Sequence, residues 1–370
     1  MKVNIIGCGV IGAAIAYHIS RVSRNDHRCF DTGAALDISV FEANPRPAMV
    51  ATGASLGVLM GACSAKARGD LINLRLRSLG MYDRWIDDLQ SQTGLSILYN
   101  RQGILNLYRS PVMSKLQSLI AIRKEQGFDL EWLEPSQMPD FLRDQTLGGL
   151  FSPCDRAVHP VQLVNALVTA SAMNGVTFYW DQPVQNLRSL VGDADAITVV
   201  TAGMGARELL APILPREILQ PIGGQAVRVR LPNLGLQQVI HAEGDLAPDI
   251  LPDLNIVPLG NDEYWLGATV EFEDRTLPRQ ENMELLRQQA IAWCPAFQDA
   301  EILETWAGHR PRPQGAKAPI LGAVPDLPHI LLAIGHYRNG VMMAPITAQI
   351  ISDLILNGGS DLPWQGFALK

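Results

Sequence analysis

The sequence predicts an α/β domain with a parallel sheet, interleaved with a second, α+β domain whose sheet is mostly antiparallel. Three observations indicate this. A strand, a glycine-rich turn and a helix open the chain, and further strand–helix units follow near residues 160–210 and 330–356. Between residues 225 and 269 the pattern changes to short strands separated by Pro, Gly and Asn/Asp turns. With 370 residues the chain is long enough for two hydrophobic cores.

Composition narrows the class of protein. Hydrophobic residues make up 47% and charged residues 18%, which is typical of a globular enzyme. The net charge of -7, without a dense Lys/Arg block, argues against a nucleic-acid partner. The cysteines contain no Cys-x-x-Cys, so we expect neither a disulfide framework nor a metal site, and a cytoplasmic location. They are Cys8, Cys29, Cys63, Cys154 and Cys294.

The first apolar run could be mistaken for a targeting segment. Residues Val3 to Ile19 are mostly apolar and follow Lys2. Glycines interrupt the run, and it is too short to span a bilayer. We therefore expect a buried strand and a packed helix here, and no strong membrane signal.

Apolar periodicity and glycine or proline breakers place the remaining elements. For the α/β domain we expect residues 1–75, 145–215 and 300–370, with strands at 2–6, 36–41, 176–180, 197–200 and 330–334 and helices at 12–20, 160–174 and 347–356. For the second domain we expect residues 76–144 and 216–299, with helices at 68–92, 112–126 and 282–293 and strands at 226–229, 239–241, 256–258 and 264–267.

The turn after the first strand carries a dinucleotide-binding motif. Gly7-x-Gly9-x-x-Gly12 allows a tight turn, a close approach of the backbone to a pyrophosphate, and close helix–strand packing. Glu42, at the end of the next strand, is placed to hold ribose hydroxyls, with residues 21–33 as a loop insertion. The α/β domain is therefore expected to be Rossmann-like. The turn alone does not separate NAD from FAD, and a glycine turn without a ligand is the alternative.

A second motif lies near the carboxyl end. Gly335-His336-Tyr337-Arg338-Asn339-Gly340 follows a strand and precedes a helix, and Thr305–Pro311 and Pro319–Gly322 accompany it. With residues 51–55, Pro221-x-x-Gly224-Gln225, Ile256–Pro258 and Gly267–Thr269, this pattern resembles the D-amino-acid-oxidase-like family of FAD-dependent oxidoreductases. Within that family the chain is most similar to glycine oxidases of the thiamin pathway.

The resemblance implies FAD as the cofactor. No cysteine lies between Gly308 and Gly315, where related enzymes attach their flavin, so we expect noncovalent binding. A helix N-terminus near Gly340 would stabilise negative charge on the reduced flavin ring. The residues implied to contact FAD are Gly7, Gly9, Val10, Ile11, Gly12, Glu42, Thr52, Ala54, Ser55, Gly57, Val184, Ala202, Gly203, Arg310, His336, Arg338, Asn339, Gly340, Val341 and Met342.

Substrate contacts are also implied by the resemblance. Arg310 is expected to pair with a substrate carboxylate, and Arg338 to lie nearer the pocket mouth, because a guanidinium fork suits a carboxylate. For each arginine the alternative is a structural ion pair or contacts to backbone carbonyls. Asn255 stands where glycine oxidases carry a tyrosine that helps hold the carboxylate.

Other positions also depart from the glycine oxidase pattern. Asp253 replaces a histidine, and Val270 and Val58 replace methionines. Asp253 is expected to favour a cationic or amino group. His336, His309 and Tyr337 are interpreted as hydrogen-bonded scaffold rather than as bases.

The expected activity is oxidation of a small amino acid or secondary amine, such as glycine, sarcosine or a small D-amino acid. The product imine would hydrolyse to a 2-oxo acid and ammonia or an amine, and O2 would be reduced to H2O2. Two alternatives stay open: a D-amino-acid dehydrogenase that uses another electron acceptor, and a catalytically impaired flavin-binding module. A homo-oligomer is possible.

Overall fold

The computed structural model describes residues 1–25, 36–110, 113–187, 196–214, 217–272 and 277–369. Its first sheet has six strands in the order β16-β17-β10-β1-β2-β9. Every neighbouring pair is parallel except β16 with β17. The strands are β1 (Lys2–Ile6), β2 (Asp37–Phe41), β9 (Thr177–Tyr179), β10 (Ala196–Val200), β16 (Ile320–Val324) and β17 (Leu327–Ile334).

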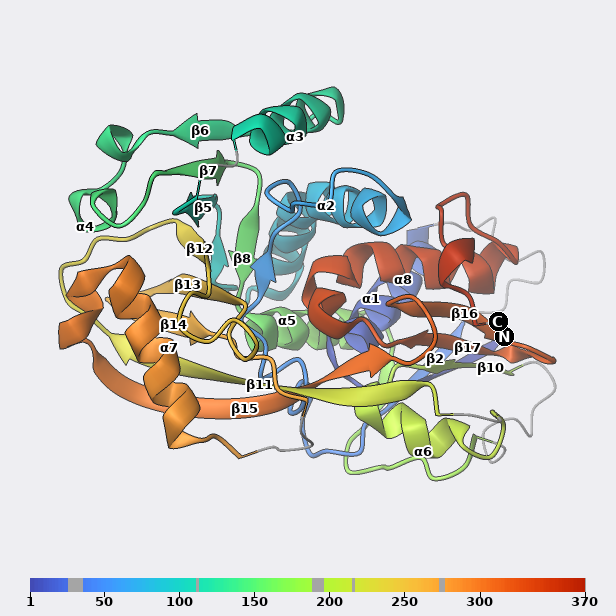
Figure 1. Ribbon diagram of the computed structural model, residues 1–370. Helices are drawn as coiled ribbons and strands as arrows, with labels where there is room; N and C mark the ends of the chain where they lie inside the picture. Colours follow the sequence, from blue (N-terminus) through green and yellow to red (C-terminus); the bar gives the residue numbers. More distant parts are fainter. Residues whose placement is uncertain (26–35, 111–112, 188–195, 215–216, 273–276, 370) are drawn as a thin grey trace.

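Helices cover both faces of this sheet, as in a doubly wound fold. Ile5 joins the core beneath four helices, whereas the next residue, Ile6, joins a smaller core with α6 (Ala206–Leu210) on the opposite face (Figure 1). The four helices are α1 (Val10–Asn25), α2 (Asp70–Thr93), α5 (Pro160–Met173) and α8 (Gly340–Asn357).

The second sheet has eight strands in the order β15-β11-β14-β13-β12-β5-β7-β6, and only β12 and β5 are parallel neighbours. Helix α7 (Gln280–Trp293) packs against one face of it. The strands are β5 (Ile104–Tyr108), β6 (Glu131–Leu133), β7 (Gly148–Ser152), β11 (Leu219–Arg230), β12 (Val239–Glu243), β13 (Asp253–Gly260), β14 (Glu263–Gly267) and β15 (Glu301–Pro313). Helices α3 (Met113–Glu125) and α4 (Asp140–Arg143) flank β6 (Figure 1).

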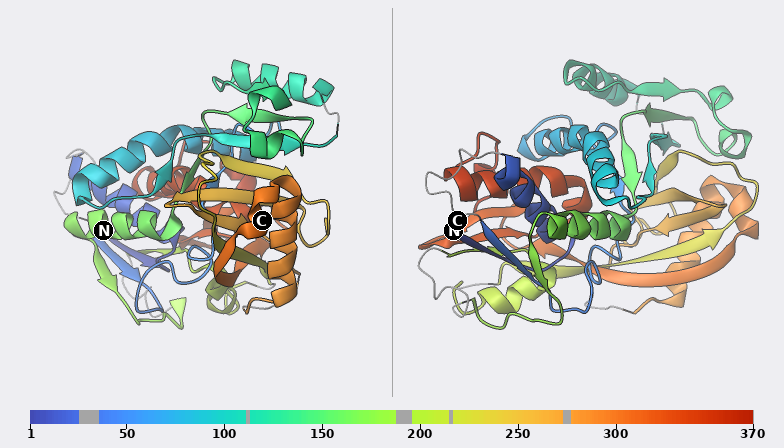
Figure 2. Two further views of the ribbon diagram at one scale, coloured as in Figure 1. Left: turned by 90° about the vertical axis from the view of Figure 1, so that its left-hand side faces the viewer. Right: turned by 180° about the vertical axis from the view of Figure 1, so that it is seen from behind.

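These two sheets confirm the expected fold class. Strands β11 and β15 pair along almost their whole length and extend beyond their neighbours toward the parallel sheet (Figures 1 and 2). The expected domain boundaries stay a prediction. Strands β7 and β15 fall within segments assigned to the α/β domain but pair in the eight-stranded sheet.

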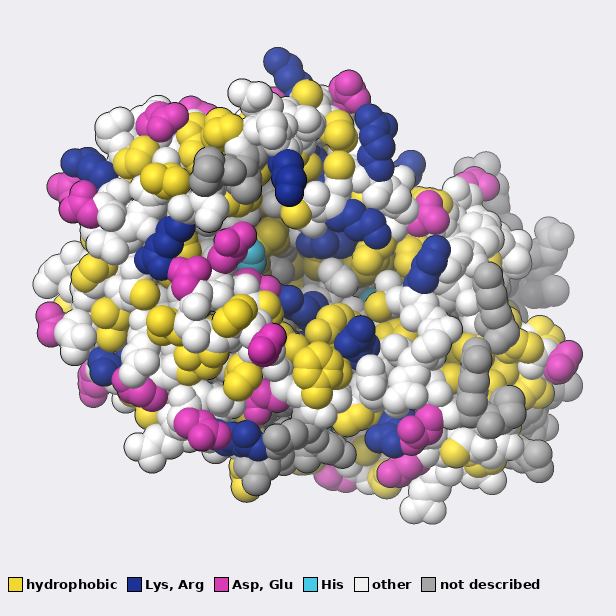
Figure 3. Space-filling view, viewed as in Figure 1, with side chains coloured by type: hydrophobic (Ala, Val, Ile, Leu, Met, Phe, Trp, Pro, Cys, Tyr) yellow, Lys and Arg dark blue, Asp and Glu magenta, His cyan; other side chains and the backbone are white. Residues whose placement is uncertain are grey.

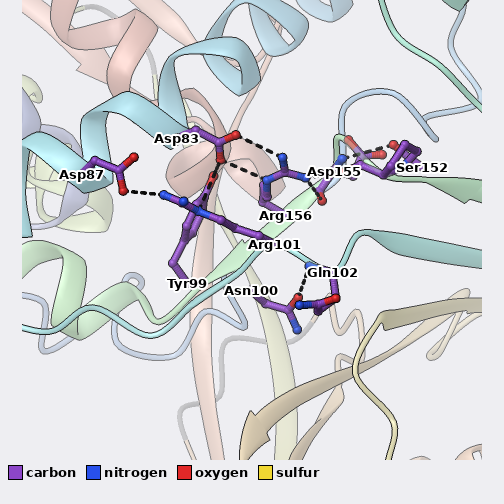
Figure 4. Close-up of polar contacts among 10 residues, drawn as sticks. Asp83, Asp87, Tyr99, Asn100, Arg101, Gln102, Ser152, Asp155 and Arg156 are labelled. Carbon is purple, nitrogen blue, oxygen red and sulfur yellow. Dashed lines mark hydrogen bonds and ion pairs between the residues drawn. The ribbon is translucent and has the colours of Figure 1, made fainter.

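A small third sheet lies between the two large ones. It consists of β3 (Val58–Leu59), β8 (Arg156–Val158) and β4 (Tyr99–Asn100). Arg156 donates to both carboxylate oxygens of Asp83 on α2, at 3.0 and 3.1 Å, and the Tyr99 hydroxyl donates to the same carboxylate at 2.7 Å (Figure 4). This network joins α2 to the third sheet.

Helix α8 begins earlier than expected, at Gly340 instead of residue 347, and contains Pro345. A proline has no N–H for the carbonyl four residues before it, which is that of Val341. The buried Tyr82 hydroxyl of α2 donates to that carbonyl instead. The apolar segment Tyr337–Asn357 is the one described helix long and apolar enough to cross a membrane, and 67% of its apolar window is buried inside the molecule. It packs in the core with α1 and α2.

The expected insertion at residues 21–33 and the five cysteines lie only partly within the described residues. Helix α1 extends through Asn25, so residues 21–25 are helical, whereas the rest of the expected insertion includes residues outside the described part of the chain. Cys8, Cys63, Cys154 and Cys294 are free thiols, and Cys29 lies outside the described residues.

Candidate active site

A cavity of about 1230 Å³ extends from the turn after β1 to the polar face of the eight-stranded sheet. Lys and Arg side chains gather around the hollow that opens on the face drawn in Figure 3. Of the residues expected to touch cofactor or substrate, only Gly12 does not line the cavity. Those that do are Gly7, Gly9, Val10, Ile11, Glu42, Thr52, Ala54, Ser55, Gly57, Val184, Ala202, Gly203, Asn255, Arg310, His336, Arg338, Asn339, Gly340, Val341 and Met342.

The glycines of the first turn have separate structural roles. Gly7 has a φ of 102°, and a Cβ there would lie 2.9 Å from the Cα of Ala202. A Cβ on Gly12 would lie 2.0 Å from the Gly7 carbonyl oxygen, so Gly12 serves helix–strand packing. At Gly9 a Cβ would reach Thr52 Oγ1 at 3.1 Å, and this hydroxyl accepts from Val10 N. The turn therefore keeps bare backbone at the cavity surface.

Glu42 lies beside this turn at the end of β2. Its Oε2 accepts from Cys8 N at 2.7 Å and its Oε1 from Asn44 N at 3.0 Å. Burial, together with the Glu42 charge, raises the pKa of the Cys8 thiol well above its usual range. Cys8 therefore stays a neutral thiol, and the carboxylate is fixed at the cavity wall.

The second glycine motif brings another helix N-terminus to the cavity. A short 3-10 turn, Tyr337–Asn339, leads into α8, whose first turn has no side-chain cap. His336 is buried and lies 3.0 Å from Thr347 Oγ1, and burial lowers its pKa to about 3. A neutral, hydrogen-bonded His336 agrees with its interpretation as scaffold.

The far wall of the cavity is a grid of polar side chains on three adjacent strands. Asn106, His241 and Asn255 are register partners across β5, β12 and β13. One pleat further, Asp253 pairs with Glu243, and Tyr108 follows on β5. All six line the cavity, while the alternating residues of these strands pack in the core with α7.

Arg310 projects from β15 into this part of the cavity. Its Nη1 donates to the carbonyl oxygens of Gly223 at 2.7 Å and Thr269 at 3.0 Å. Burial and the nearby Arg338 lower its pKa to about 10, so it remains cationic at neutral pH. Its hydrogen-bond partners in the described ranges are neutral, so no carboxylate of these ranges is bonded to the guanidinium.

Arg338, by contrast, is paired. Its Nη2 donates to both oxygens of Asp253, at 2.6 and 2.8 Å. The Arg338 charge lowers the pKa of the Asp253 carboxyl against the opposing effect of burial. Asp253 therefore does not present a free negative charge to a cationic substrate group, contrary to the expectation from sequence.

Asn255 is buried, and both ends of its amide have a hydrogen-bond partner. Its Oδ1 lies 3.0 Å from His241 Nδ1, and its Nδ2 donates to the Gly267 carbonyl at 3.3 Å. Because burial lowers the pKa of His241, the ring is neutral, and the amide oxygen requires the proton on Nδ1. Asn255 therefore orients His241.

Sequence reasoning missed several residues of this cavity. Arg75 comes from α2, and the amphipathic pattern of that helix gave no sign that a cation faces inward. Four more polar ones are Asn106, Tyr108, His241 and Glu243. Their common signal, polar residues at alternate positions of two strands, becomes visible only once β5 is paired with β12.

Backbone segment 60–64 forms another part of the wall, and buried charges hold it. The Asp155 carboxylate accepts from the backbone N–H groups of Gly61, Ala62 and Cys63 at 2.6, 2.8 and 2.8 Å. Arg123 donates to the carbonyls of Ala62 and Ser64 at 2.9 and 3.1 Å. The Asp155 carboxylate thus holds backbone N–H groups of this segment, and the Arg123 guanidinium holds backbone carbonyl groups.

The model of the family described as "FAD dependent oxidoreductase" matches residues 2–354 of this sequence. The chain belongs to this family. Its cofactor is accordingly FAD, and the site fits that molecule: bare backbone at the first turn, the Glu42 carboxylate, and a second uncapped helix N-terminus border one continuous cavity.

Individual members of the FAD dependent oxidoreductase family are also similar to this chain. The bifunctional protein ThiO/ThiG of Synechocystis is 31% identical over 377 residues, which cover 96% of this chain and 51% of that protein. The chain thus spans about half the length of this relative. The glycine oxidase of Bacillus subtilis is 24% identical, with 97% of this chain and 94% of the relative covered.

Solved structures agree on the fold. A glycine oxidase from Geobacillus kaustophilus superposes with a TM-score of 0.86 at 24% identity, covering 100% of this chain and 98% of the other. An L-proline dehydrogenase from P. horikoshii gives 0.82 at 16% identity and 99% coverage of this chain. The two sheets and their connections are therefore the glycine oxidase-like fold.

Proposed function

We propose that this chain oxidises the Cα–N bond of a small amino acid or secondary amine, such as glycine, sarcosine or a small D-amino acid. The imine product hydrolyses to a 2-oxo acid and ammonia or an amine. O2 is the proposed electron acceptor, reduced to H2O2, and a cytoplasmic role in supplying thiamin synthesis is part of the proposal. The similarity to ThiO/ThiG and to glycine oxidases supports this function.

The observation that carries the proposal is the state of Arg310. A half-buried guanidinium that bonds only to backbone carbonyls among the described residues retains a charge that a substrate carboxylate can neutralise with charge-assisted hydrogen bonds. Arg338 is less suited to bind the substrate carboxylate because its guanidinium already pairs with Asp253. Arg310 would hold the amino acid by its carboxylate at the cofactor end of the polar wall.

Positioning is the main task of these residues. Bound FAD supplies the oxidant, which accepts a hydride from the substrate Cα. The amine must be neutral for this step, and none of the neutral histidines at the wall has to act as a base. Water that reaches the polar wall after oxidation can hydrolyse the imine.

Anaerobic titration of the FAD-loaded protein tests the activity. Glycine, sarcosine, D-alanine and D-proline are added in turn while the flavin band near ~450 nm, an ordinary property of the cofactor, is recorded. Bleaching by one of these amines, followed by stoichiometric H2O2 on admission of air, is the expected result. Bleaching without peroxide indicates a dehydrogenase, and a flavin that no amine bleaches contradicts the proposal.

Substitution of Arg310 tests the carboxylate contact. Arg310→Met keeps most of the packing volume and removes the guanidinium group. We expect kcat/KM to fall, chiefly because KM rises, by a factor that corresponds to about 2–4 kcal/mol. The visible spectrum should stay that of bound flavin. Arg84→Gln, an exposed position on α2, is the control. Unchanged steady-state kinetics in Arg310→Met would place the carboxylate elsewhere.

A further inference from the structure

The cavity contains a second guanidinium that the proposed reaction does not use. Arg75 projects from α2 and lines the same cavity as Arg310. Its Nη2 donates to the Met60 carbonyl and its Nη1 to Ser64 Oγ at 3.2 Å. Its Nε is buried and has no hydrogen-bond partner among the described residues. All of its bonded partners are neutral.

Asp155, Asp253 and Glu243 make no hydrogen bond to Arg75 in the described part of the chain. Asp155 lies close enough to act on its charge, but that carboxylate accepts from three backbone N–H groups of segment 61–63. Asp253 is held by both of its bonds to Arg338. Glu243 is exposed at the cavity wall, where water screens its charge. Arg75 is half-buried with a buried Nε, and its charge is therefore incompletely neutralised by the described residues.

Tyr108 adds a second donor to this part of the cavity. The Asn106 amide donates to the Tyr108 hydroxyl oxygen at 2.8 Å, which leaves the hydroxyl proton available to another acceptor. Burial raises the pKa of Tyr108 to about 12, so the hydroxyl keeps that proton at neutral pH. Tyr108 and segment 60–64, which binds Arg75, pack in one side-chain cluster.

We propose that Arg75 and Tyr108 form a second anion-binding subsite in this cavity, and that the amino acid oxidised by the chain carries a second acidic group. Arg310 would take the α-carboxylate and Arg75 the distal one, as with a small D-amino dicarboxylate. This inference rests on the proposed function for the oxidation step. The binding of a second acidic group can be tested without that step.

Paired ligands without an α-amine isolate the binding claim. Succinate and glutarate are compared with their monoamides, succinamate and glutaramate, which match them in shape but lack the second charge. Binding to the FAD-loaded protein is followed by perturbation of the flavin absorption spectrum. We expect at least one diacid to bind about 10-fold more tightly than its monoamide, the usual size of one additional charge-assisted contact.

Variants then assign the preference to Arg75. In Arg75→Gln the diacid and its monoamide should bind within about 2-fold of each other, and Arg75→Lys, which retains the charge without the fork, should give an intermediate ratio. Arg77→Gln, an exposed position two residues further on the same helix, should keep the full preference. Flavin content and melting temperature confirm that each variant is folded.

The outcomes separate the two proposals. Equal binding of diacids and monoamides to the unmodified protein overturns the subsite, as does a preference that survives in Arg75→Gln. For turnover, D-glutamate and D-aspartate are compared with D-glutamine and D-asparagine by anaerobic flavin bleaching, with the acids expected to react faster by about 10-fold. If diacids bind selectively but no amine bleaches the flavin, the oxidase function fails and the anion subsite stands.

Discussion

Several ionisable side chains at the site are kept in one charge state by their surroundings. Desolvation keeps His336 and His241 neutral, and Asp253 and Arg338 neutralise each other. Arg310 and Arg75 keep charges that no bonded carboxylate among the described residues balances. Those two arginines therefore present positive charge to a substrate, although the chain as a whole is acidic.

The pKa of His336 makes a prediction about acid stability. Its folded pKa of about 3 lies below the ordinary unfolded value of ~6.5, so the unfolded chain binds the proton first as the pH falls. This contribution to stability is complete above that unfolded value and is lost between it and about pH 3, with a slope of up to about 1.4 kcal/mol per pH unit.

His336→Asn should therefore flatten the dependence of unfolding free energy on pH between about 6 and 4, relative to the unmodified protein. Urea unfolding at a series of pH values measures this. His329→Asn, at a half-buried position on β17, is the matched control. Parallel curves for the unmodified protein and His336→Asn would show that His336 is not held neutral.

Among the elements, α8 depends on a neighbour for its first turn. The Tyr82 hydroxyl takes the place of the backbone N–H that Pro345 lacks. Tyr82→Phe should leave the Val341 carbonyl buried without a donor and lower the unfolding free energy by about 1–3 kcal/mol. Because Val341 lines the cavity, retention of FAD should weaken as well.

A double-mutant cycle isolates this hydrogen bond. Pro345→Ala restores an N–H that can donate to Val341, so Tyr82→Phe should cost less in that background than in the unmodified protein. Urea unfolding of the four proteins gives the coupling energy, and Tyr179→Phe, an exposed tyrosine, is the control. Additive costs would mean that the hydroxyl does not replace the missing backbone donor.

The elements also show how far sequence reasoning could reach. The strands of the parallel sheet are short apolar runs, and such runs can be recognised in the sequence as buried strands. Strands β1, β2 and β10 lie close to their expected positions. Strand β15 was missed because it carries polar residues and two prolines and is half-buried along most of its length, without alternation. Its extended form comes from pairing with β11, which local patterning cannot reveal.

The whole molecule brings the site together from distant parts of the chain. The glycine motifs are local, and nearly all of the residues that the sequence led us to expect at the cofactor line the cavity. The polar wall requires β5 to lie beside β12, more than 100 residues later, and no local signal specifies that pairing. Arg75 was missed for the same reason, since its role depends on where α2 packs.

A substitution of Asp155 tests how the third sheet, between the two large ones, supports the site. It precedes β8 and holds segment 61–63, while the adjacent Arg156 holds α2 (Figure 4). Asp155→Asn replaces one acceptor oxygen with a donor that opposes a backbone N–H, so we expect a loss of about 2–4 kcal/mol in unfolding free energy. Substrate KM should rise, because the segment lines the cavity.

Urea unfolding and steady-state kinetics measure the two effects. Asp144→Asn, an exposed carboxyl after α4, serves as the control. A stable Asp155→Asn protein with unchanged KM would show that the carboxylate is dispensable for the shape of segment 60–64.

Arg310, Asp253 and Asn255 lie on strands of one sheet, whereas the glycine turns expected to approach the cofactor belong to the other. A new side chain on the polar wall meets an open cavity, but a methyl group at Gly12 would collide with the Gly7 carbonyl. Mutations in the polar wall can therefore alter substrate preference while the glycine turns of the parallel sheet stay unchanged. A lineage with this architecture can acquire new substrates without having to rebuild its oxidant.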